Sequence, residues 1–97
     1  MRTSILVIVL LTFFARSYSQ NKDSLNQVTY QQAAEKLQAN DLSEATRLFT
    51  QVIDAGYNLK DSYAKRGVAR YLQNDFKGAK EDLDEAVKQR ANTVEVF

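Results

Sequence analysis

The chain has 97 residues, with 13 Lys and Arg against 12 Asp and Glu and a formal net charge of +1. This balance lacks the basic excess of nucleic-acid-binding proteins and gives no reason to expect adhesion to an anionic membrane. Cys and His are both absent, which excludes disulfides, the commonest zinc ligands and the usual Ser/His/Asp or Cys/His catalytic systems. Because Pro is absent and Gly occurs only three times, few residues interrupt helices, and we expect an all-α protein. We expect that the protein is not an enzyme and that it binds no cofactor and no metal.

The first residues have the three parts of a secretory signal peptide. Arg2 precedes an uncharged apolar run over 5–15, and the small residues Ser17 and Ser19 follow on either side of Tyr18. A transmembrane helix needs ~20 apolar residues, and this run is shorter and ends at Arg16. We therefore predict a cleaved signal peptide over 1–19, export to the periplasm or the outside, and no stable membrane insertion of the mature chain. An uncleaved N-terminal membrane anchor and a buried core helix are the alternatives.

The rest of the chain repeats itself with a period of 34 residues. Asn40-Asp41-Leu42 recurs as Asn74-Asp75-Phe76, and small and large apolar residues match at the same offset. The matched pairs are Ala33 and Gly67, Ala34 and Val68, Leu37 and Tyr71, Ala45 and Ala79, Phe49 and Leu83, Val52 and Ala86, and Ile53 and Val87. A fixed period of this length indicates an α-solenoid, in which each unit packs against the next. The predicted divisions are a polar segment over 20–25, repeats over 26–59 and 60–93, and the start of a third repeat over 94–97.

Each predicted repeat contains two runs of apolar residues at helical spacing, separated by an Asn-Asp pair. The runs of the first repeat are Tyr30, Ala33, Ala34 and Leu37, then Ala45, Leu48, Phe49, Val52 and Ile53; those of the second are Tyr63, Ala64, Gly67, Val68, Tyr71 and Leu72, then Phe76, Ala79, Leu83, Ala86 and Val87. The pattern predicts two tandem antiparallel helix-turn-helix units. The aromatic side chains are expected in the core, with Tyr30 and Tyr71 the most exposed of them.

Several residues indicate where these helices begin and end. Asp41 and Glu44 are spaced as a capping box, in which each side chain binds a free backbone N–H of the first turn. Gly56 stands where a helix ends in a left-handed residue. Asn92, with Glu95 three residues later, predicts a break and the cap of a third repeat.

The residues Tyr63, Gly67, Ala79, Leu83 and Ala86 resemble the core pattern of the tetratricopeptide repeat family. The resemblance covers residues 28–90. It implies that Gly67 and Ala79 allow the two helices of a hairpin to approach closely, while Phe76 and Leu83 fill the space between neighbouring helices.

In this family the first helices of the repeats line a concave groove that binds peptides. The resemblance therefore implies an unidentified protein or peptide partner. Its groove would consist of Gln27, Tyr30, Gln31, Ala34, Leu37 and Gln38 from the first repeat and Asp61, Ala64, Lys65, Val68, Tyr71 and Leu72 from the second. The carboxylate clamp of the chaperone-binding subgroup is not expected, because Tyr30, Ala34 and Lys65 replace its Lys and Asn residues.

Two charged clusters have a functional and a structural interpretation. The acidic cluster consists of Glu81, Asp82, Asp84 and Glu85. The basic cluster consists of Lys65, Arg66 and Arg70. The acidic cluster is compatible with a metal or catalytic site, and the basic cluster with an acidic peptide. Because charged runs on amphipathic helices usually face water, we expect both clusters on solvated surfaces.

The last predicted helix would have no following repeat to cover its apolar side. Its residues Ala79, Leu83, Ala86 and Val87 would stay partly exposed, which favours self-association through a C-terminal hydrophobic face. An alternative function follows from this. The chain could be the N-terminal part of a longer solenoid with a structural or assembly role.

Overall fold

The computed structural model describes residues 22–94, and the side chains of residues 22–91. Over this range all regular structure is helical, which confirms the all-α prediction. An N-terminal helix over 22–38 is followed by α2 (Leu42–Asp54), α3 (Leu59–Leu72) and α4 (Phe76–Val94). The predicted signal peptide over 1–19 lies outside the described residues, and the predicted polar segment is already helical from residue 22.

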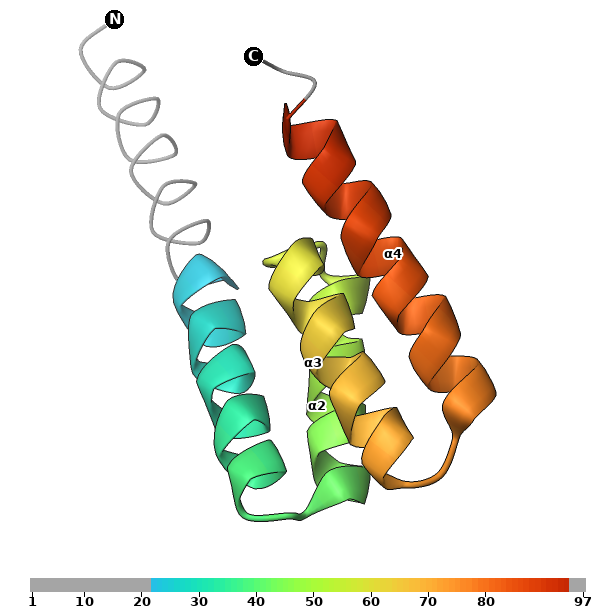
Figure 1. The fold of residues 1–97 in the computed structure, drawn as a ribbon. Helices are drawn as coiled ribbons and strands as arrows, with labels where there is room; N and C mark the ends of the chain where they lie inside the picture. Colours follow the sequence, from blue (N-terminus) through green and yellow to red (C-terminus); the bar gives the residue numbers. More distant parts are fainter. Residues whose placement is uncertain (1–21, 95–97) are drawn as a thin grey trace, which may run out of the picture.

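The helices form two hairpins, which we call the first hairpin (22–54) and the second hairpin (59–94). In Figure 1 the N-terminal helix and α4 lie at opposite edges, α3 lies between them, and α2 lies behind α3. Both hairpin turns are at the same end of the molecule. Because α3 packs against both α2 and α4, it joins the two hairpins.

Three helix ends have the same backbone geometry. Asn40, Gly56 and Asn74 have positive φ angles of 62°, 72° and 67°, a left-handed conformation that Gly and Asn adopt most easily. In each case the following N–H donates to a carbonyl five residues earlier, as from Asp41 to Lys36 and from Asp75 to Arg70, each at 2.9 Å. This is the Schellman arrangement that closes a helix. The prediction of a left-handed residue at Gly56 is confirmed.

The predicted helix starts agree less well with the structure. Asp41 makes no side-chain cap bond, and Glu44 pairs with Arg47 instead, so the capping-box prediction is wrong. Asp75, at the equivalent place 34 residues later, does accept a bond from the backbone N–H of Gly78 at 3.0 Å. The predicted break at Asn92 does not occur, since α4 continues to Val94.

The first hairpin contains a well-covered apolar core. Its buried members come from both helices, and partly buried side chains surround them. The buried set is Ala33, Ala45, Leu48, Phe49 and Val52; the partly buried set is Tyr30, Ala34, Leu37 and Tyr57. Tyr30 makes edge-to-face contacts with Phe49 and with Tyr57, at ring-centre distances of 5.9 and 6.1 Å. Tyr57, at the entry to α3, extends this core to the next hairpin.

The second hairpin is held by a close crossing of α3 and α4. A Cβ atom placed on Gly67 would lie 3.1 Å from Cγ of Leu83 and 3.3 Å from the carbonyl oxygen of Ala79. The predicted close approach at Gly67 and Ala79 is therefore confirmed. The expectation that Phe76 fills the space between helices is wrong, because this side chain is 57% exposed. Leu83, which was also expected to fill the space between neighbouring helices, is 43% exposed and fills it only in part.

Candidate functional site

An exposed apolar surface lies on α3 and the start of α4. Val68, Tyr71 and Leu72 of α3 are 45%, 58% and 51% exposed, and Phe76 follows them at the start of α4. The rings of Tyr71 and Phe76 meet edge to face at 5.3 Å between centres, so the turn between α3 and α4 brings the two aromatic side chains together. We call these four residues the α3 patch. Adjacent exposed apolar side chains of this kind mark interaction surfaces.

The predicted groove residues lie on the N-terminal helix and on α3, and some are exposed while others are half-buried. Gln27, Gln31 and Gln38 of the N-terminal helix and Val68, Tyr71 and Leu72 of α3 are exposed; Tyr30, Ala34, Leu37, Asp61, Ala64 and Lys65 are half-buried. Amide side chains therefore dominate the exposed part on the N-terminal helix, and apolar side chains dominate it on α3. Phe76 was not predicted for this surface. Its place directly after the Asn74 turn, close to Tyr71, is the signal that could have indicated it.

Tyr30 and Asp61 connect the two groups of predicted groove residues. Burial raises the pKa of Tyr30 above its ordinary value, and the negative charge of Asp61 on α3 raises it further, with a smaller contribution from Tyr57. The N-terminal helix and the start of α3 are therefore close enough for one side chain to influence the other. Because Tyr30 also packs on Phe49, its ring belongs mainly to the core, and Tyr71 is the more exposed of the two tyrosines.

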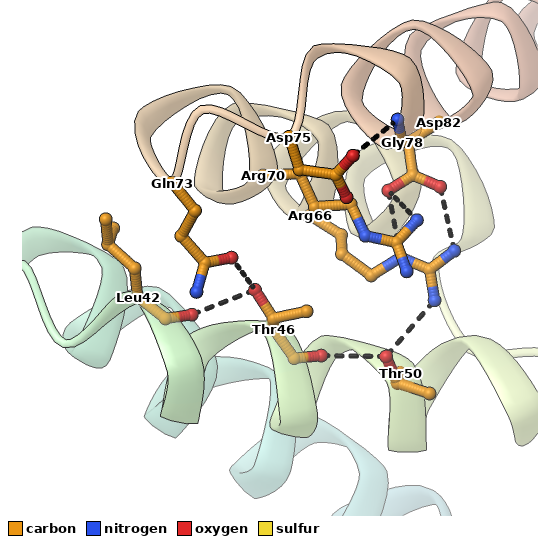
Figure 2. A network of polar contacts seen from close by, with 9 residues as sticks. All are labelled: Leu42, Thr46, Thr50, Arg66, Arg70, Gln73, Asp75, Gly78 and Asp82. Atoms are coloured by element: carbon orange, nitrogen blue, oxygen red, sulfur yellow. Dashed lines mark hydrogen bonds and ion pairs between the residues drawn. The ribbon is translucent and has the colours of Figure 1, made fainter.

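The most buried polar contacts of the described residues surround Asp82 of α4 (Figure 2). Arg66 of α3 donates to both carboxylate oxygens of Asp82, from Nε to Oδ2 at 2.9 Å and from Nη2 to Oδ1 at 2.7 Å. Arg70, one turn later, donates from Nη1 to Oδ2 at 3.0 Å. Such a bidentate, charge-assisted pair is stronger than a neutral hydrogen bond. The same contacts raise the pKa of Arg66 above its ordinary value, so it stays charged.

These contacts correct two predictions about charged surfaces. Asp82 is 3% exposed, so it is not part of a solvated acidic face. The side chains of Arg66 and Arg70 are 12% and 26% exposed, so they do not form a solvated basic face. Among the described residues, no group of three or more acidic side chains converges as metal ligands would.

Arg66 also contacts the first hairpin. Its Nη1 donates to Oγ1 of Thr50 on α2 at 3.1 Å, and this hydroxyl donates to the carbonyl oxygen of Thr46 at 2.8 Å. One turn before Thr50, the Thr46 hydroxyl lies 3.2 Å from Oε1 of Gln73 (Figure 2). The guanidinium of Arg66 thus joins α2, α3 and α4. Both oxygens of Asp82 accept hydrogen bonds from these arginines, so the buried network connects the two hairpins.

A separate hollow of about 370 Å³ lies between the first turns of α3 and the middle of α4. Its apolar wall includes Ala64, Leu83 and Val87, and the charged side chains of Lys60, Asp61 and Arg90 complete the lining. The hollow lies on the side of α4 that no further helix of the described chain covers.

The comparisons with known proteins add no relative. No family model, curated protein or solved structure matches the chain. Within residues 22–94, no helix combines the length and hydrophobicity needed to span a membrane.

Proposed function

We propose that the chain is a binding scaffold of the tetratricopeptide type, which takes up a segment of a partner protein on α3 and the neighbouring N-terminal helix. The observation that carries this proposal is the exposure of Val68, Tyr71 and Leu72 on α3. The buried residues of α3 are Ser62, Gly67 and Ala69, so these three larger side chains lie outside its buried face. Large apolar side chains that are about half exposed are available to a partner.

The chemistry of the surface indicates the kind of ligand. The α3 patch offers aliphatic and aromatic anchors, of which Tyr and other aromatic residues often dominate binding energy. The exposed amide groups of Gln27, Gln31 and Gln38 can both donate and accept hydrogen bonds. A peptide backbone needs such partners when it is extended on a surface. The ligand we propose is therefore an apolar peptide segment that places side chains on the α3 patch and its backbone near the glutamines.

The proposal also includes the family of the chain and its export from the cytoplasm. The resemblance over residues 28–90 supports the tetratricopeptide assignment. The starts of α2 and α4, at Leu42 and Phe76, support it further because they are 34 residues apart. The apolar run over 5–15, with its basic start and small exit residues, supports export. N-terminal sequencing of the protein recovered outside the cytoplasm tests this: a start at Gln20 is expected, and an intact Met1 would contradict cleavage.

Selection from a displayed peptide library tests the binding function. The wild-type chain is the bait, and a Val68→Asp/Leu72→Asp variant is used for counter-selection, so that only peptides depending on the α3 patch are kept. Both positions are exposed, and circular dichroism of the variant should match that of the wild type. We expect enriched peptides with spaced apolar residues, whose affinity falls at least tenfold on the variant. Enrichment of only those peptides that bind both proteins equally would contradict the proposal.

A further inference from the structure

The contact between the two hairpins supplies a template for a contact between two molecules. Arg66 of α3 and Gln73, the residue directly after α3, bind side chains of α2. Ser62 and Ala69 lie on the same stripe of α3 at helical spacing. Ser62 and Ala69 are both completely buried. The stripe Ser62, Arg66, Ala69 and Gln73 is therefore the face that α3 turns toward α2.

The N-terminal helix carries the equivalent stripe without a covering partner among the described residues. Subtracting the 34-residue period from the α3 stripe gives Val28, Gln32, Glu35 and Ala39, all of them exposed. We call these four residues the N-terminal edge. Val28 is 48% exposed, and Leu25, one turn before it, is 65% exposed. The N-terminal helix thus has the face that α3 buries, with apolar side chains in water.

The other edge of the molecule carries the matching surface. On α2, Ser43, Thr46 and Thr50 contact Arg66 or Gln73 through their hydroxyl groups. Phe49 and Ile53 lie on the same stripe of α2 at helical spacing. Adding the period gives Lys77, Lys80, Leu83, Asp84 and Val87, all of them exposed. We call these five residues the C-terminal edge. Phe49 is fully buried, whereas its equivalent Leu83 is 43% exposed, which shows how much cover this edge lacks.

We propose that the C-terminal edge of one molecule binds the N-terminal edge of a second copy, in the way that α2 binds α3. Figure 1 shows the two helices that carry these edges on opposite sides of the molecule, so one copy can offer one edge while the other stays free. A contact between two different surfaces is heterologous, and it can be repeated from copy to copy. This proposal concerns self-assembly and does not depend on the peptide-binding function.

The side chains that would meet are complementary in charge and polarity. In the intramolecular contact Arg66 donates to Thr50; at the same place between two copies, the Gln32 amide would donate to the carboxylate of Asp84. Glu35 takes the place of Ala69, which lies between Arg66 and Gln73 on the stripe. Lys80 takes the place of Thr46, whose hydroxyl lies 3.2 Å from Gln73, so Glu35 and Lys80 would lie close together. Opposite charges and donor-acceptor pairs at these positions favour this orientation over like surfaces meeting.

The apolar parts of the two edges match as well. Val28 takes the place of Ser62, near the hollow whose wall includes Leu83 and Val87. The cations Lys60 and Arg90 line the same hollow, and the first turn of the incoming helix carries the acidic residue Asp23. A symmetric pairing of two α4 helices would cover Val87 but would leave Val28 and Leu25 in water. The second copy in head-to-tail orientation covers both apolar surfaces.

Two variants of the full chain test the proposal, each blocking one edge. Val28→Glu blocks the N-terminal edge and Val87→Glu blocks the C-terminal edge; their side chains are 48% and 66% exposed, so neither change should affect folding. Val68→Glu, at a 45% exposed position of the α3 patch, is the matched control outside both edges. Circular dichroism confirms that all proteins are folded, and sedimentation velocity over a range of concentrations measures their mass.

The expected results distinguish the head-to-tail contact from other assemblies. The wild type and Val68→Glu should form dimers and larger species as concentration rises, and each blocked variant alone should stay monomeric. An equal mixture of Val28→Glu and Val87→Glu should form a dimer that does not grow, because one intact contact remains. The proposal is overturned by a wild type that is monomeric throughout, by a Val28→Glu variant that associates like the wild type, or by a mixture that stays monomeric.

Discussion

Asp82 and Leu48 occupy equivalent places in the two hairpins, 34 residues apart, and both are buried although one is charged and the other apolar. Leu48 packs into the apolar core of the first hairpin. Asp82 is accommodated because Arg66 and Arg70 of α3 bind both of its oxygens. The second hairpin thus replaces part of an apolar core by an ion pair that Arg66 extends to α2 through Thr50.

Removal of the Asp82 carboxylate should destabilise the protein strongly. Asp82→Ala leaves two arginines without their partner, and breaking a buried pair in this way costs about 3–5 kcal/mol. We expect about 3 kcal/mol, because the arginine side chains keep some access to water. Urea unfolding followed by circular dichroism measures this.

A neighbouring aspartate is the matched control for that experiment. Asp84→Ala removes an exposed pair with Lys80, and such surface pairs contribute about 0–1 kcal/mol. Asp82→Ala should therefore lose clearly more stability than Asp84→Ala. Equal losses of stability at Asp82 and Asp84 would mean that the ion pair does not join the helices.

The two hairpin turns should respond differently to the loss of their aspartates. Asp75 accepts a bond from the N–H of Gly78, whereas Asp41 makes no such bond. Loss of a side-chain cap costs about 1 kcal/mol, so Asp75→Ala should lower the unfolding midpoint in urea and Asp41→Ala should leave it nearly unchanged. A larger effect at Asp41 would contradict the cap geometry described for the two helices.

The close crossing of α3 and α4 should not tolerate a larger side chain at Gly67. Gly67→Val would place atoms against the Leu83 side chain and the backbone carbonyl of Ala79, and overpacking of this kind costs about 1–3 kcal/mol. Thermal unfolding measures the loss. The double variant Gly67→Val/Leu83→Ala should recover part of it, since the nearest side-chain atom is removed. If the double variant recovers no stability, the strain does not arise from the contact between residue 67 and the Leu83 side chain.

The titration of Tyr30 tests whether the N-terminal helix lies against α3. Its pKa should lie above the ordinary value of 10.0, chiefly because of burial and then because of Asp61. NMR of labelled tyrosine rings, assigned with Tyr30→Phe, follows the titration. Asp61→Asn should lower the pKa of Tyr30 while leaving it above 10.0. An unchanged pKa in that variant would show that Asp61 does not act on Tyr30.

The same shift predicts a dependence of stability on pH. A group with a raised pKa in the folded state binds its proton more tightly there, so its contribution is complete below the unfolded pKa and is lost as pH rises through the folded one. Stability of the wild type should therefore fall above about pH 10. The stability of Tyr30→Phe should fall less over the same pH interval. Urea unfolding at several pH values measures both proteins. A parallel decline in both proteins would contradict the assignment.

The helices could be predicted from the sequence because their apolar spacing and turn residues agree. Asn40, Gly56 and Asn74 each end a helix in a left-handed conformation, and the apolar runs on either side have helical spacing. The charged residues were harder to place. Arg66 and Arg70 look like a surface face when α3 is considered alone, and only the packing of α4 shows that they bind Asp82. The 34-residue match of Asp82 with Leu48 was the available sign of burial.

The sequence predicted which helices carry the candidate binding surface, but it predicted less well which residues of those helices are exposed. Val68, Tyr71 and Leu72 are exposed on α3, whereas Tyr30 and Ala34 on the N-terminal helix are partly covered. Spacing within one helix cannot indicate how much of a face its neighbours cover. The contribution of Phe76 depends on the Asn74 turn, which brings its ring to Tyr71.

The most direct test of the binding function is an NMR titration of the isotope-labelled chain with a library-selected peptide. We predict chemical-shift changes concentrated at the α3 patch and at Gln27, Gln31 and Gln38 of the N-terminal helix, and loss of those changes in the Val68→Asp/Leu72→Asp variant. Changes confined to the C-terminal edge on α4, or changes that persist in that variant, would contradict the proposal that the chain binds its partner through α3.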